Sequence, residues 1–484
     1  MSTTLDPVAF WARVRPDRTA LRMGSEVWTY GRLEEAVSHA ALALYDQGLV
    51  SGEHVSIEFG AEQGLHFAAT LHALHRAELL PTLVAESLPE PQRIALRNRA
   101  NVDFALTSTP EPAEAAARRG KGPRPPRFER RLTAPAAICF TSGTEGDARA
   151  VVLTHGNFLW SALASARNLG VRADDLWLAC LPLHHVGGLS ILTRSAYYGT
   201  AALIHDRFDA DAVNHAIDAE GVTLTSLVPP QLERVLAARN DRLAPASLRA
   251  VLVGGGPAPA ALLERAAALG MRALPTYGMT ETTSQITTLS PRDWPRGLDT
   301  VGRPLPFARV EARGPDGRAL PAGEPGDLYA RGPMVTSGSF GGDEPPPRGD
   351  PRWLRTGDIG VFDAEGRLRI LDRRLDRFVV GGENVSATEV ERVIASHPSV
   401  REACVVGIPA DAWGHEIAVA VVLREGARVT LEELRAHAGA TLASYQLPRR
   451  LWIVASLPRS GTGKVLRGEV RRRLGDEVLE KDRA

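Results

Sequence analysis

Lys464 is the residue of this sequence that is best placed to do chemistry. Only three of the 57 basic residues are lysines, and the other two, Lys121 and Lys481, lie in a Pro/Arg-rich stretch and in the last four residues. Lys464 ends the glycine-rich turn 458–464. An ammonium group is a compact point charge, whereas a guanidinium is a rigid planar fork. A chain that otherwise uses arginine predicts a reaction that needs a point charge here; a lysine retained by chance in an exposed turn is the alternative.

The segment 140–149 is dense in hydroxyl side chains and glycines, and it follows an apolar, strand-like run. Such a loop can wrap backbone N–H groups around phosphate oxygens. It lacks the Gly-Lys-Ser/Thr ending of a Walker A loop. The sequence therefore predicts a phosphate-binding loop of another kind, with an ordinary polar loop as the alternative. The candidate phosphate ligands are Thr141, Ser142, Gly143, Thr144, Gly146 and Arg149.

Two glycine-containing segments each follow a predicted strand. Three consecutive glycines, Gly254 to Gly256, let a flat group approach the backbone closely; a tight strand-to-helix turn is the alternative. In the segment 276–282, Thr280 and Glu281 offer a hydroxyl and a carboxylate, the hard oxygen ligands that magnesium prefers. The alternative for Glu281 is a surface position on a helix.

Two further polar positions are candidates for a binding site. Asp358 follows a glycine, and its carboxylate suits a pair of ribose hydroxyls. His185 lies between His184 and the glycine pair 187–188, where it can line a pocket. A structural hydrogen bond is the alternative use of this histidine.

The composition excludes several classes of protein. The chain has 484 residues and a formal net charge of zero, which gives no electrostatic case for nucleic acid or an anionic membrane as the main partner. The first ten residues show no signal-peptide pattern, and no apolar run approaches the roughly 20 residues of a membrane span. The cysteines Cys139, Cys180 and Cys404 stand singly among apolar residues, which argues against a disulfide framework or a zinc site. We expect a cytoplasmic protein whose partners are small molecules, with a catalytic thiol as a less favoured use of a cysteine and a homo-oligomer left open.

The elements that must position these residues alternate between strands and helices up to about residue 300. The spacing of apolar residues predicts helices over 32–47, 64–76 and 258–269 and strands over 54–59, 222–228 and 248–253. Asn157 is expected to cap a helix that runs to Gly170, Asp209 to cap one that ends near Gly221, and Pro229 to open another. This order predicts a mainly parallel sheet covered by helices.

After residue 300 the pattern changes to short strand-like segments separated by Gly/Pro turns. A helix over 386–396, strands over 400–407 and 417–423 and a helix over 431–442 predict a small α+β domain. The expected fold is α/β: a large N-terminal domain, 1–372, of layered mainly parallel sheets with helices plus a small β-rich subdomain, and a small mobile α+β domain, 373–484. The Pro-, Arg- and Ala-rich stretch 108–131 is expected to be a linker or an exposed loop.

Taken together, these motifs resemble those of the adenylate-forming superfamily of acyl- and aryl-CoA synthetases, peptide-synthetase adenylation domains and luciferases. The loop 141–149 is similar to the phosphate loop of that family, and 277–282 matches its Tyr-Gly-x-Thr-Glu motif. Later motifs match at 356–358, 372–373, 381–384 and 458–464. Within the superfamily, the segments 181–194, 253–259 and 278–291 most resemble the o-succinylbenzoate–CoA ligases of menaquinone biosynthesis.

The resemblance implies a reaction in two halves that uses ATP, Mg²⁺ and CoA. A carboxylate attacks the α-phosphorus of ATP to give an acyl-adenylate and pyrophosphate, and the thiol of CoA then displaces AMP. Both steps build negative charge on oxygens, so preorganised cations and N–H donors are expected to dominate catalysis. Lys464 would bridge the carboxylate and the α-phosphate, Glu281 would hold magnesium, and Thr280 would contact phosphate.

The other site residues are assigned by the same resemblance. The nucleotide would be bound by the phosphate loop together with Gly255, Gly256, Tyr277, Gly278, Asp358 and Arg373. His185 would lie at the acyl pocket and the CoA channel, Ser190, Arg194 and Ser284 would contact the acyl substrate, and Gly381 and Gly382 would contact CoA. Arg194 is the candidate partner of a substrate carboxylate because arginine recognises planar anions bidentately; a structural ion pair is the alternative.

In this superfamily the C-terminal domain moves between the two half-reactions, and a key lysine on the small domain fits such gating. The phosphate loop departs from the family pattern at Glu145, Ala148, Arg149 and Ala150, and the usual hinge position holds Leu375. The departures at Glu145 and Ala150 leave an inactive nucleotide-binding relative as one alternative to the o-succinylbenzoate ligase. A CoA ligase for another aromatic or short acyl acid is the other alternative.

Overall fold

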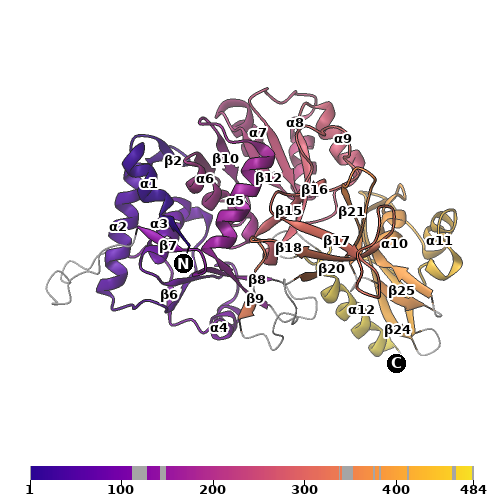
Figure 1. Ribbon diagram of the computed structural model, residues 1–484. Coiled ribbons are helices and arrows are strands. Elements are labelled where there is room, and N and C mark those ends of the chain that lie inside the picture. Colours follow the sequence, from indigo (N-terminus) through magenta and orange to yellow (C-terminus); the bar gives the residue numbers. More distant parts are fainter. Residues whose placement is uncertain are drawn as a thin grey trace.

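The structure is a computed structural model that places two large sheets, a small sheet and a C-terminal α+β unit along one elongated body (Figure 1). It describes residues 2–111, 128–141, 149–336, 338–340, 353–373, 377–380, 383–410, 414–459 and 465–481.

The first large sheet has nine strands and a parallel centre. Its order is β16 (Arg303–Pro304), β15 (Ser284–Thr288), β14 (Ala273–Met279), β13 (Ala250–Val253), β12 (Leu224–Leu227), β10 (Leu176–Ala179), β11 (Ala201–Ile204), β2 (Thr19–Met23) and β3 (Glu26–Thr29). The strands from β14 to β2 are parallel, and β15, β16 and β3 add antiparallel edges. Every residue of β10 and β13 is buried, as expected for parallel strands that are covered on both faces.

Helices cover both faces of this sheet. On one face pack α7 (Ala210–Ala219), α8 (Pro229–Arg239) and α9 (Ala260–Ala268). On the other face, a larger core joins the sheet to α2 (Tyr30–Asp46), α3 (Gly64–Arg76) and α6 (Val186–Tyr198) and to the second large sheet. This core is the layered arrangement that the strand–helix alternation predicts.

The second large sheet has six strands and carries the predicted phosphate loop. Its order is β19 (Ser339–Phe340), β9 (Arg149–Thr154), β8 (Pro135–Thr141), β5 (Leu80–Leu83), β4 (His54–Ile57) and β6 (Phe104–Leu106). The strands β8 and β9 form an antiparallel hairpin, and α5 (His155–Leu169) follows β9. The same part of the chain contains α4 (Glu90–Arg99), the 3₁₀ turn η1 (Ala61–Gln63) and a two-stranded sheet of β1 (Thr3–Leu5) and β7 (Glu129–Arg131).

Two smaller units complete the chain. The strands β17 (Arg309–Arg313), β18 (Gly326–Arg331), β20 (Leu354–Phe362) and β21 (Leu368–Arg373) form an antiparallel sheet. The C-terminal unit lies at one end of the molecule and has its own core (Figure 1). Its elements are β22 (Arg377–Val380), β23 (Glu383–Ser386), α10 (Ala387–Ala395), β24 (Val400–Ala410), β25 (Gly414–Leu423), α11 (Leu431–Gly439), the turn η5 (Ser444–Gln446), β26 (Arg450–Ile453) and α12 (Arg467–Lys481).

Most predicted elements are confirmed, and one helix cap is wrong. The helix expected over 64–76 is α3, and Asp209 caps α7 through its side chain. Asn157 does not cap α5: the cap is Thr154, whose hydroxyl accepts the Asn157 N–H at 3.1 Å, while the Asn157 amide oxygen accepts the Thr154 N–H at 2.9 Å. The pair is a reciprocal capping box, so the helix begins three residues earlier than the sequence suggested.

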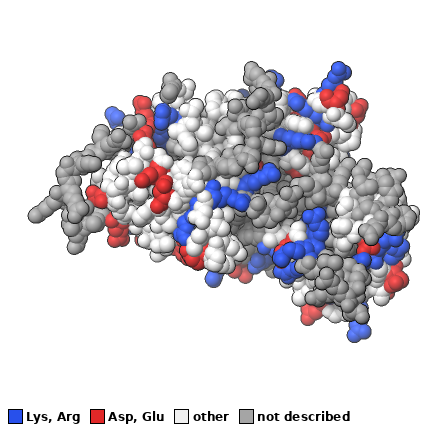
Figure 2. All heavy atoms as spheres, turned by 90° about the horizontal axis from the view of Figure 1, so that it is seen from below, with Lys and Arg blue, Asp and Glu red and all other residues white. Residues whose placement is uncertain are grey.

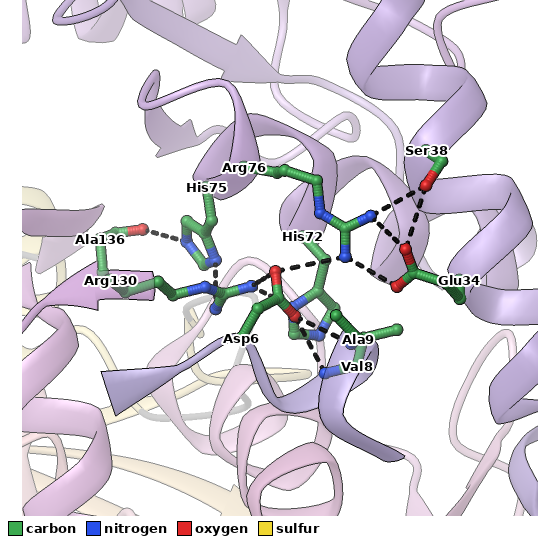
Figure 3. A network of polar contacts seen from close by, with 10 residues as sticks. All are labelled: Asp6, Val8, Ala9, Glu34, Ser38, His72, His75, Arg76, Arg130 and Ala136. Atoms are coloured by element: carbon green, nitrogen blue, oxygen red, sulfur yellow. Dashed lines mark hydrogen bonds and ion pairs between the residues drawn. The ribbon is translucent and has the colours of Figure 1, made fainter. Parts of the chain in front are cut away.

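A buried network of charges anchors the first helix, α1 (Pro7–Val14), to the base of the β8–β9 hairpin (Figure 3). Asp6 caps α1 and accepts hydrogen bonds from Arg130 at 2.8 Å and Arg76 at 3.3 Å. Arg76 also forms a two-pronged pair with Glu34 at 2.7 and 2.8 Å. His75 contacts the Ala136 carbonyl oxygen of β8 at 2.7 Å. Residues far apart in the sequence are therefore joined behind the phosphate-loop hairpin.

The surface carries both signs of charge. On the face shown in Figure 2, basic and acidic side chains are interspersed, in keeping with a formal net charge of zero. Within the described parts of the chain, none of the helices combines the length and the apolar character that crossing a bilayer requires.

Candidate active site

The Thr-Glu motif lies in a tight turn at the end of β14. Tyr277 and Gly278 are still part of this strand rather than after it, and Thr280 and Glu281 form the 3₁₀ turn η3 (Thr280–Thr282). The returning strand β15 passes so close to Gly278 that a Cβ atom there would lie 1.6 Å from the Ser284 carbonyl oxygen. Only glycine fits this position, which explains the spacing of the motif.

Several hydrogen bonds hold this turn in a strained conformation. Thr283 and Ser284 have positive φ angles of 52° and 81°, which residues other than glycine rarely adopt. The Thr283 hydroxyl donates to the Met334 carbonyl oxygen at 2.7 Å, and the Thr336 N–H donates to the Glu281 carbonyl oxygen at 2.8 Å. Such over-determined strain is typical of sites whose geometry matters for function.

The phosphate-loop hairpin lies beside the same turn. Thr141 and Arg149 face each other at the open ends of β8 and β9, and η3 packs against both strands. The Thr336 hydroxyl donates to the Val152 carbonyl oxygen of β9 at 2.5 Å. The structure therefore brings the ends of the predicted phosphate loop next to Thr280 and Glu281.

Tyr277 and Asp358, which are 81 residues apart, are in direct contact. The Tyr277 hydroxyl donates to the Asp358 carboxylate at 2.6 Å, and Asp358 is only 4% exposed. The Thr356 hydroxyl accepts the Asp358 N–H at 3.2 Å and donates to the Leu328 carbonyl oxygen at 3.0 Å. On the neighbouring strand Arg373 is the register partner of Asp358. These contacts fix the direction of one buried carboxylate beside an aromatic ring.

The glycine loop 254–256 lies next to this pair, because β13 and β14 are neighbours in the sheet. Gly255 has a φ of +78°, and a Cβ atom on Gly254 would lie 2.7 Å from the Thr276 side chain. Gly256 has open space around it. Two of the three glycines are thus required by backbone geometry, and the third leaves room beside the backbone.

The two histidines lie between β10 and α6. His185 is the residue that precedes α6, and the rings of His184 and His185 are 4.3 Å apart. Burial lowers the pKa of His185 to about 4, and burial together with His185 lowers the pKa of His184 to about 3. Both imidazoles are therefore neutral at pH 7 and can accept or donate a hydrogen bond without carrying charge.

Arg194 of α6 is buried, and it has no carboxylate partner in the part of the chain that the structure describes. Its side chain is 3% exposed and lies over the ring of Trp177, with 5.8 Å between the guanidinium carbon and the ring centroid. One Nη atom donates to the Ser161 hydroxyl at 2.9 Å, and among the described residues no carboxylate oxygen lies within 4.0 Å of the guanidinium. Burial lowers its pKa from the ordinary value. One turn earlier on the same helix, the buried Ser190 hydroxyl also has no partner among the described residues.

Part of the predicted site lies outside the described residues. This applies to Lys464, to Gly381 and Gly382, and to Ser142, Gly143, Thr144 and Gly146 of the phosphate loop. For Arg373 only the backbone is described.

The sequence reasoning missed Ser161, Thr283 and Thr336, which join the site by hydrogen bonds to backbone carbonyl oxygens. Single hydroxyl residues carry no spacing signal, so nothing in the sequence singled them out. At α5, in contrast, Thr154 and Asn157 are both residues that can cap a helix, and the structure shows that Thr154 precedes the first turn.

The donor set at the turn fits magnesium. Magnesium usually takes one or two carboxylates and completes its shell with water and substrate phosphates. Glu281 is half-buried, next to the hydroxyl of Thr280 and beside the ends of the phosphate loop. Among the residues that the structure describes, no group of three His, Cys, Asp or Glu side chains could bind a metal on its own. The residues present therefore fit a magnesium ion that arrives together with a nucleotide.

Comparison with known proteins assigns a family to nearly the whole chain. Residues 8–340 match the family described as AMP-binding enzyme, and residues 389–464 match the AMP-binding enzyme C-terminal domain. A 2–succinylbenzoate–CoA ligase of Bacillus cereus is 37% identical over 469 residues, which cover 95% of this chain and 96% of the relative. The ligase of the same name from Bacillus cytotoxicus is 36% identical over 475 residues, which cover 96% and 98%.

Solved structures resemble the whole fold. The o-succinylbenzoate CoA synthetase (MenE) of Bacillus subtilis, in complex with the acyl-adenylate intermediate OSB-AMP, superposes with a TM-score of 0.89 at 31% identity, covering 97% of this chain and 99% of that chain. The same synthetase in complex with ATP and a magnesium ion gives a TM-score of 0.88 at 31% identity, covering 97% and 100%.

Proposed function

This chain belongs to the AMP-binding enzyme family, and from that premise we propose that it is an ATP-dependent ligase that joins o-succinylbenzoate to CoA in menaquinone biosynthesis. The observation that carries the substrate assignment is Arg194, a buried cation without a carboxylate partner among the described residues. A diacid such as o-succinylbenzoate can present one carboxylate for activation and the other to this guanidinium.

In the first half-reaction, a substrate carboxylate attacks the α-phosphorus of ATP and pyrophosphate leaves. We propose that Lys464 bridges the attacking carboxylate and the α-phosphate, and that the phosphate loop with Thr280 binds the phosphate oxygens. Glu281 is the residue that would hold magnesium, which neutralises phosphate charge when it is bound. The strained turn supports this assignment, because it holds these oxygen donors beside the ends of the loop.

The nucleoside would lie between the glycine loop and β20. Asp358 is oriented by Tyr277 at 2.6 Å, and both of its carboxylate oxygens can accept hydrogen bonds from ribose hydroxyls. Arg373 would assist from the opposite position of the neighbouring strand. Gly255, Gly256 and Gly278 leave the backbone accessible to a flat base.

In the second half-reaction, the CoA thiol attacks the acyl carbonyl and AMP leaves. We propose that residues 373–484 act as a mobile domain that withdraws Lys464 and presents Gly381 and Gly382 to CoA. His185, neutral at pH 7, would line the channel, with Ser190 and Ser284 along the acyl group. This division of the chain is supported by the end of β21 at Arg373 and by the separate core of the C-terminal unit.

The protein would work in the cytoplasm with small molecules as partners. Its three cysteines are unpaired and buried, which fits a reducing compartment.

A panel of acids tests the proposed function. Pyrophosphate release would be measured with and without CoA for o-succinylbenzoate, benzoate, a medium-chain fatty acid and acetate, and thioester formation would be followed in parallel. We expect kcat/KM for o-succinylbenzoate to exceed that for the other acids by at least about 100-fold, because they lack the second carboxylate that would form a buried charge-assisted contact with Arg194. Equal turnover of benzoate would point to a different acid, and release without thioester formation would point to a different acceptor.

Substitution of Lys464 tests the first half-reaction separately. Lys464→Ala and Lys464→Arg are expected to lower carboxylate-dependent pyrophosphate exchange by about 1000-fold or more, because a transition-state contact to developing charge is lost or misplaced. Thioester formation from supplied acyl-adenylate should fall much less. Exchange by Lys464→Arg at the wild-type rate would contradict the need for a point charge.

A further inference from the structure

Among the described residues, Ser161 provides the one hydroxyl that joins Arg194 to the turn carrying Glu281. It lies on α5, is 3% exposed, and its Oγ atom is 2.9 Å from an Nη atom of Arg194 and 2.8 Å from the Thr283 carbonyl oxygen. A hydroxyl has one hydrogen and two lone pairs. Because a guanidinium only donates and a carbonyl oxygen only accepts, Ser161 must accept from Arg194 and donate to Thr283.

Both ends of this bridge belong to the site. Thr283 ends the 3₁₀ turn that contains Thr280 and Glu281, and its N–H donates to the Thr280 carbonyl oxygen at 3.0 Å. Its own position is fixed by a positive φ of 52° and by the bond from its hydroxyl to Met334. The bridge therefore ties the guanidinium to a rigid part of the backbone rather than to another mobile side chain.

Arg194 depends on this bridge for its orientation. Its Nε atom has no partner among the described residues, and the aromatic contact to Trp177 limits its position but not its rotation within the plane of the guanidinium. Burial restricts the rotamers of the Arg194 side chain, and the hydrogen bond to Ser161 fixes the direction in which one Nη atom points. Among the described residues, the Ser161 hydroxyl is the only acceptor of an Arg194 hydrogen bond.

We propose that Ser161 is a positioning residue that sets substrate choice: it holds the Arg194 guanidinium at a fixed place relative to the Thr280–Glu281 turn, so that a diacid is held with one carboxylate on Arg194 and the other at the reacting centre. This inference rests on the proposed function, because it takes Arg194 as the partner of the second carboxylate. Ser161 itself does not need to touch the substrate.

The experiment compares Ser161→Ala with a matched control on two kinds of substrate. The acids are o-succinylbenzoate and its two monoacid analogues, one without the ring carboxylate and one without the chain carboxylate; the analogue that still turns over keeps the reacting carboxylate. Ser161→Ala should lower kcat/KM by about tenfold for the diacid and by less than about twofold for that monoacid. Ser195→Ala removes another buried hydroxyl, one without a partner among the described residues, and should change neither value.

A second arm separates positioning from a purely structural role. In an Arg194→Met background, Ser161→Ala should add less than about a twofold loss for the diacid, because there is no guanidinium left to hold. Ser161→Thr, which keeps the hydroxyl, should recover activity relative to Ser161→Ala. Equal losses for diacid and monoacid, or additive losses in the double variant, would overturn the proposal.

The substrate preference of the wild-type enzyme tests the proposed function independently of these variants. If it prefers another diacid, the same comparison is made with that acid and its monoacid analogue. If its preferred acid has no second anionic group, the role of Ser161 is overturned together with that of Arg194, while the adenylation chemistry at Lys464 and Glu281 is unaffected.

Discussion

Two regions of this molecule bury arginine in opposite ways. In the N-terminal network, Arg76 and Arg130 are 1% and 5% exposed and share the carboxylate of Asp6, with Glu34 as a second partner of Arg76. In the site, Arg194 is 3% exposed and has a hydroxyl and an aromatic ring as neighbours, without a carboxylate among the described residues. The arginines of the two regions are buried to a similar extent, but only those of the N-terminal network have a described carboxylate partner.

The difference is the one we expect between a structural use of charge and the functional use proposed for Arg194. A buried cation is costly unless a partner compensates it, and the N-terminal network provides that partner within the fold. Burial raises the pKa of Asp6, but Arg130 and Arg76 more than offset this and hold it well below the ordinary value. At Arg194 no described carboxylate provides this compensation, as expected where a ligand supplies the anion. The comparison predicts that the stability of the two regions responds differently to the removal of a buried charge.

The largest expected effect comes from acid and concerns the N-terminal network. Burial lowers the pKa of His72 to about 3, and burial with neighbouring charges holds the pKa values of His75 and His155 well below 6.5. Below pH 6.5 the unfolded chain therefore binds more protons than the folded one, so the unfolding free energy decreases as the pH is lowered. The three groups should cost about 5 kcal/mol of unfolding free energy between pH 6.5 and pH 5, and His184 and His185 add in the same direction.

Urea unfolding followed at several pH values measures this loss, and the slope against pH counts the protons taken up on unfolding. A slope near three or more protons below pH 6 is expected, with little change between pH 7 and pH 8. An unfolding free energy that stays constant down to pH 5 would mean that the histidines titrate within the folded protein.

The second effect comes from removing the shared counter-charge. Among the described residues, Asp6→Asn leaves Arg76 with Glu34 as its one carboxylate partner and leaves Arg130 with none. The substitution should lower the unfolding free energy by about 3–5 kcal/mol. Activity per folded molecule should remain, since the network lies behind the hairpin and not at the reacting centre. A variant as stable as the wild type would show that this pairing does not stabilise the fold.

The third effect is a loss of activity without a loss of stability, the reverse of what is expected for Asp6→Asn. Arg194→Met removes a buried cation that the fold does not compensate, so the unfolding free energy should stay within about 1 kcal/mol of wild type or rise. In contrast, kcat/KM for o-succinylbenzoate should fall by about 100-fold, while KM for ATP changes little. A large loss of stability with equal losses for both substrates would place Arg194 with the structural arginines.

The smallest effect is expected at the surface and serves as the control for Asp6→Asn. Arg318 and Asp316 form an ion pair in which the side chains are 88% and 61% exposed. Asp316→Asn makes the same chemical change in water and should alter stability by less than about 0.5 kcal/mol. A cost similar to that of Asp6→Asn would show that burial is not what distinguishes the two pairs.

The sequence alone determined the features that depend on neighbours along the chain. The apolar spacing over 64–76 predicted α3 at its full length, and Asp209 marked the start of α7, because helix periodicity and capping act over a few residues. The motifs at 276–282 and 356–358 predicted a nucleotide site, since a glycine or a carboxylate at a fixed offset is visible without the fold. The same local reasoning failed at α5, where Asn157 and Thr154 are both capping residues and only the geometry shows which one precedes the first turn.

Only the tertiary structure decided which of these residues meet and which charges are compensated. The Tyr277–Asp358 bond spans 81 residues and the Ser161–Thr283 bond spans 122, and both depend on how separate strands and helices pack. The sequence left open whether Arg194 has a structural ion pair, since 57 acidic residues could in principle have supplied one. Packing placed none of the described ones beside it, and that arrangement of charge in space is what no local pattern can encode.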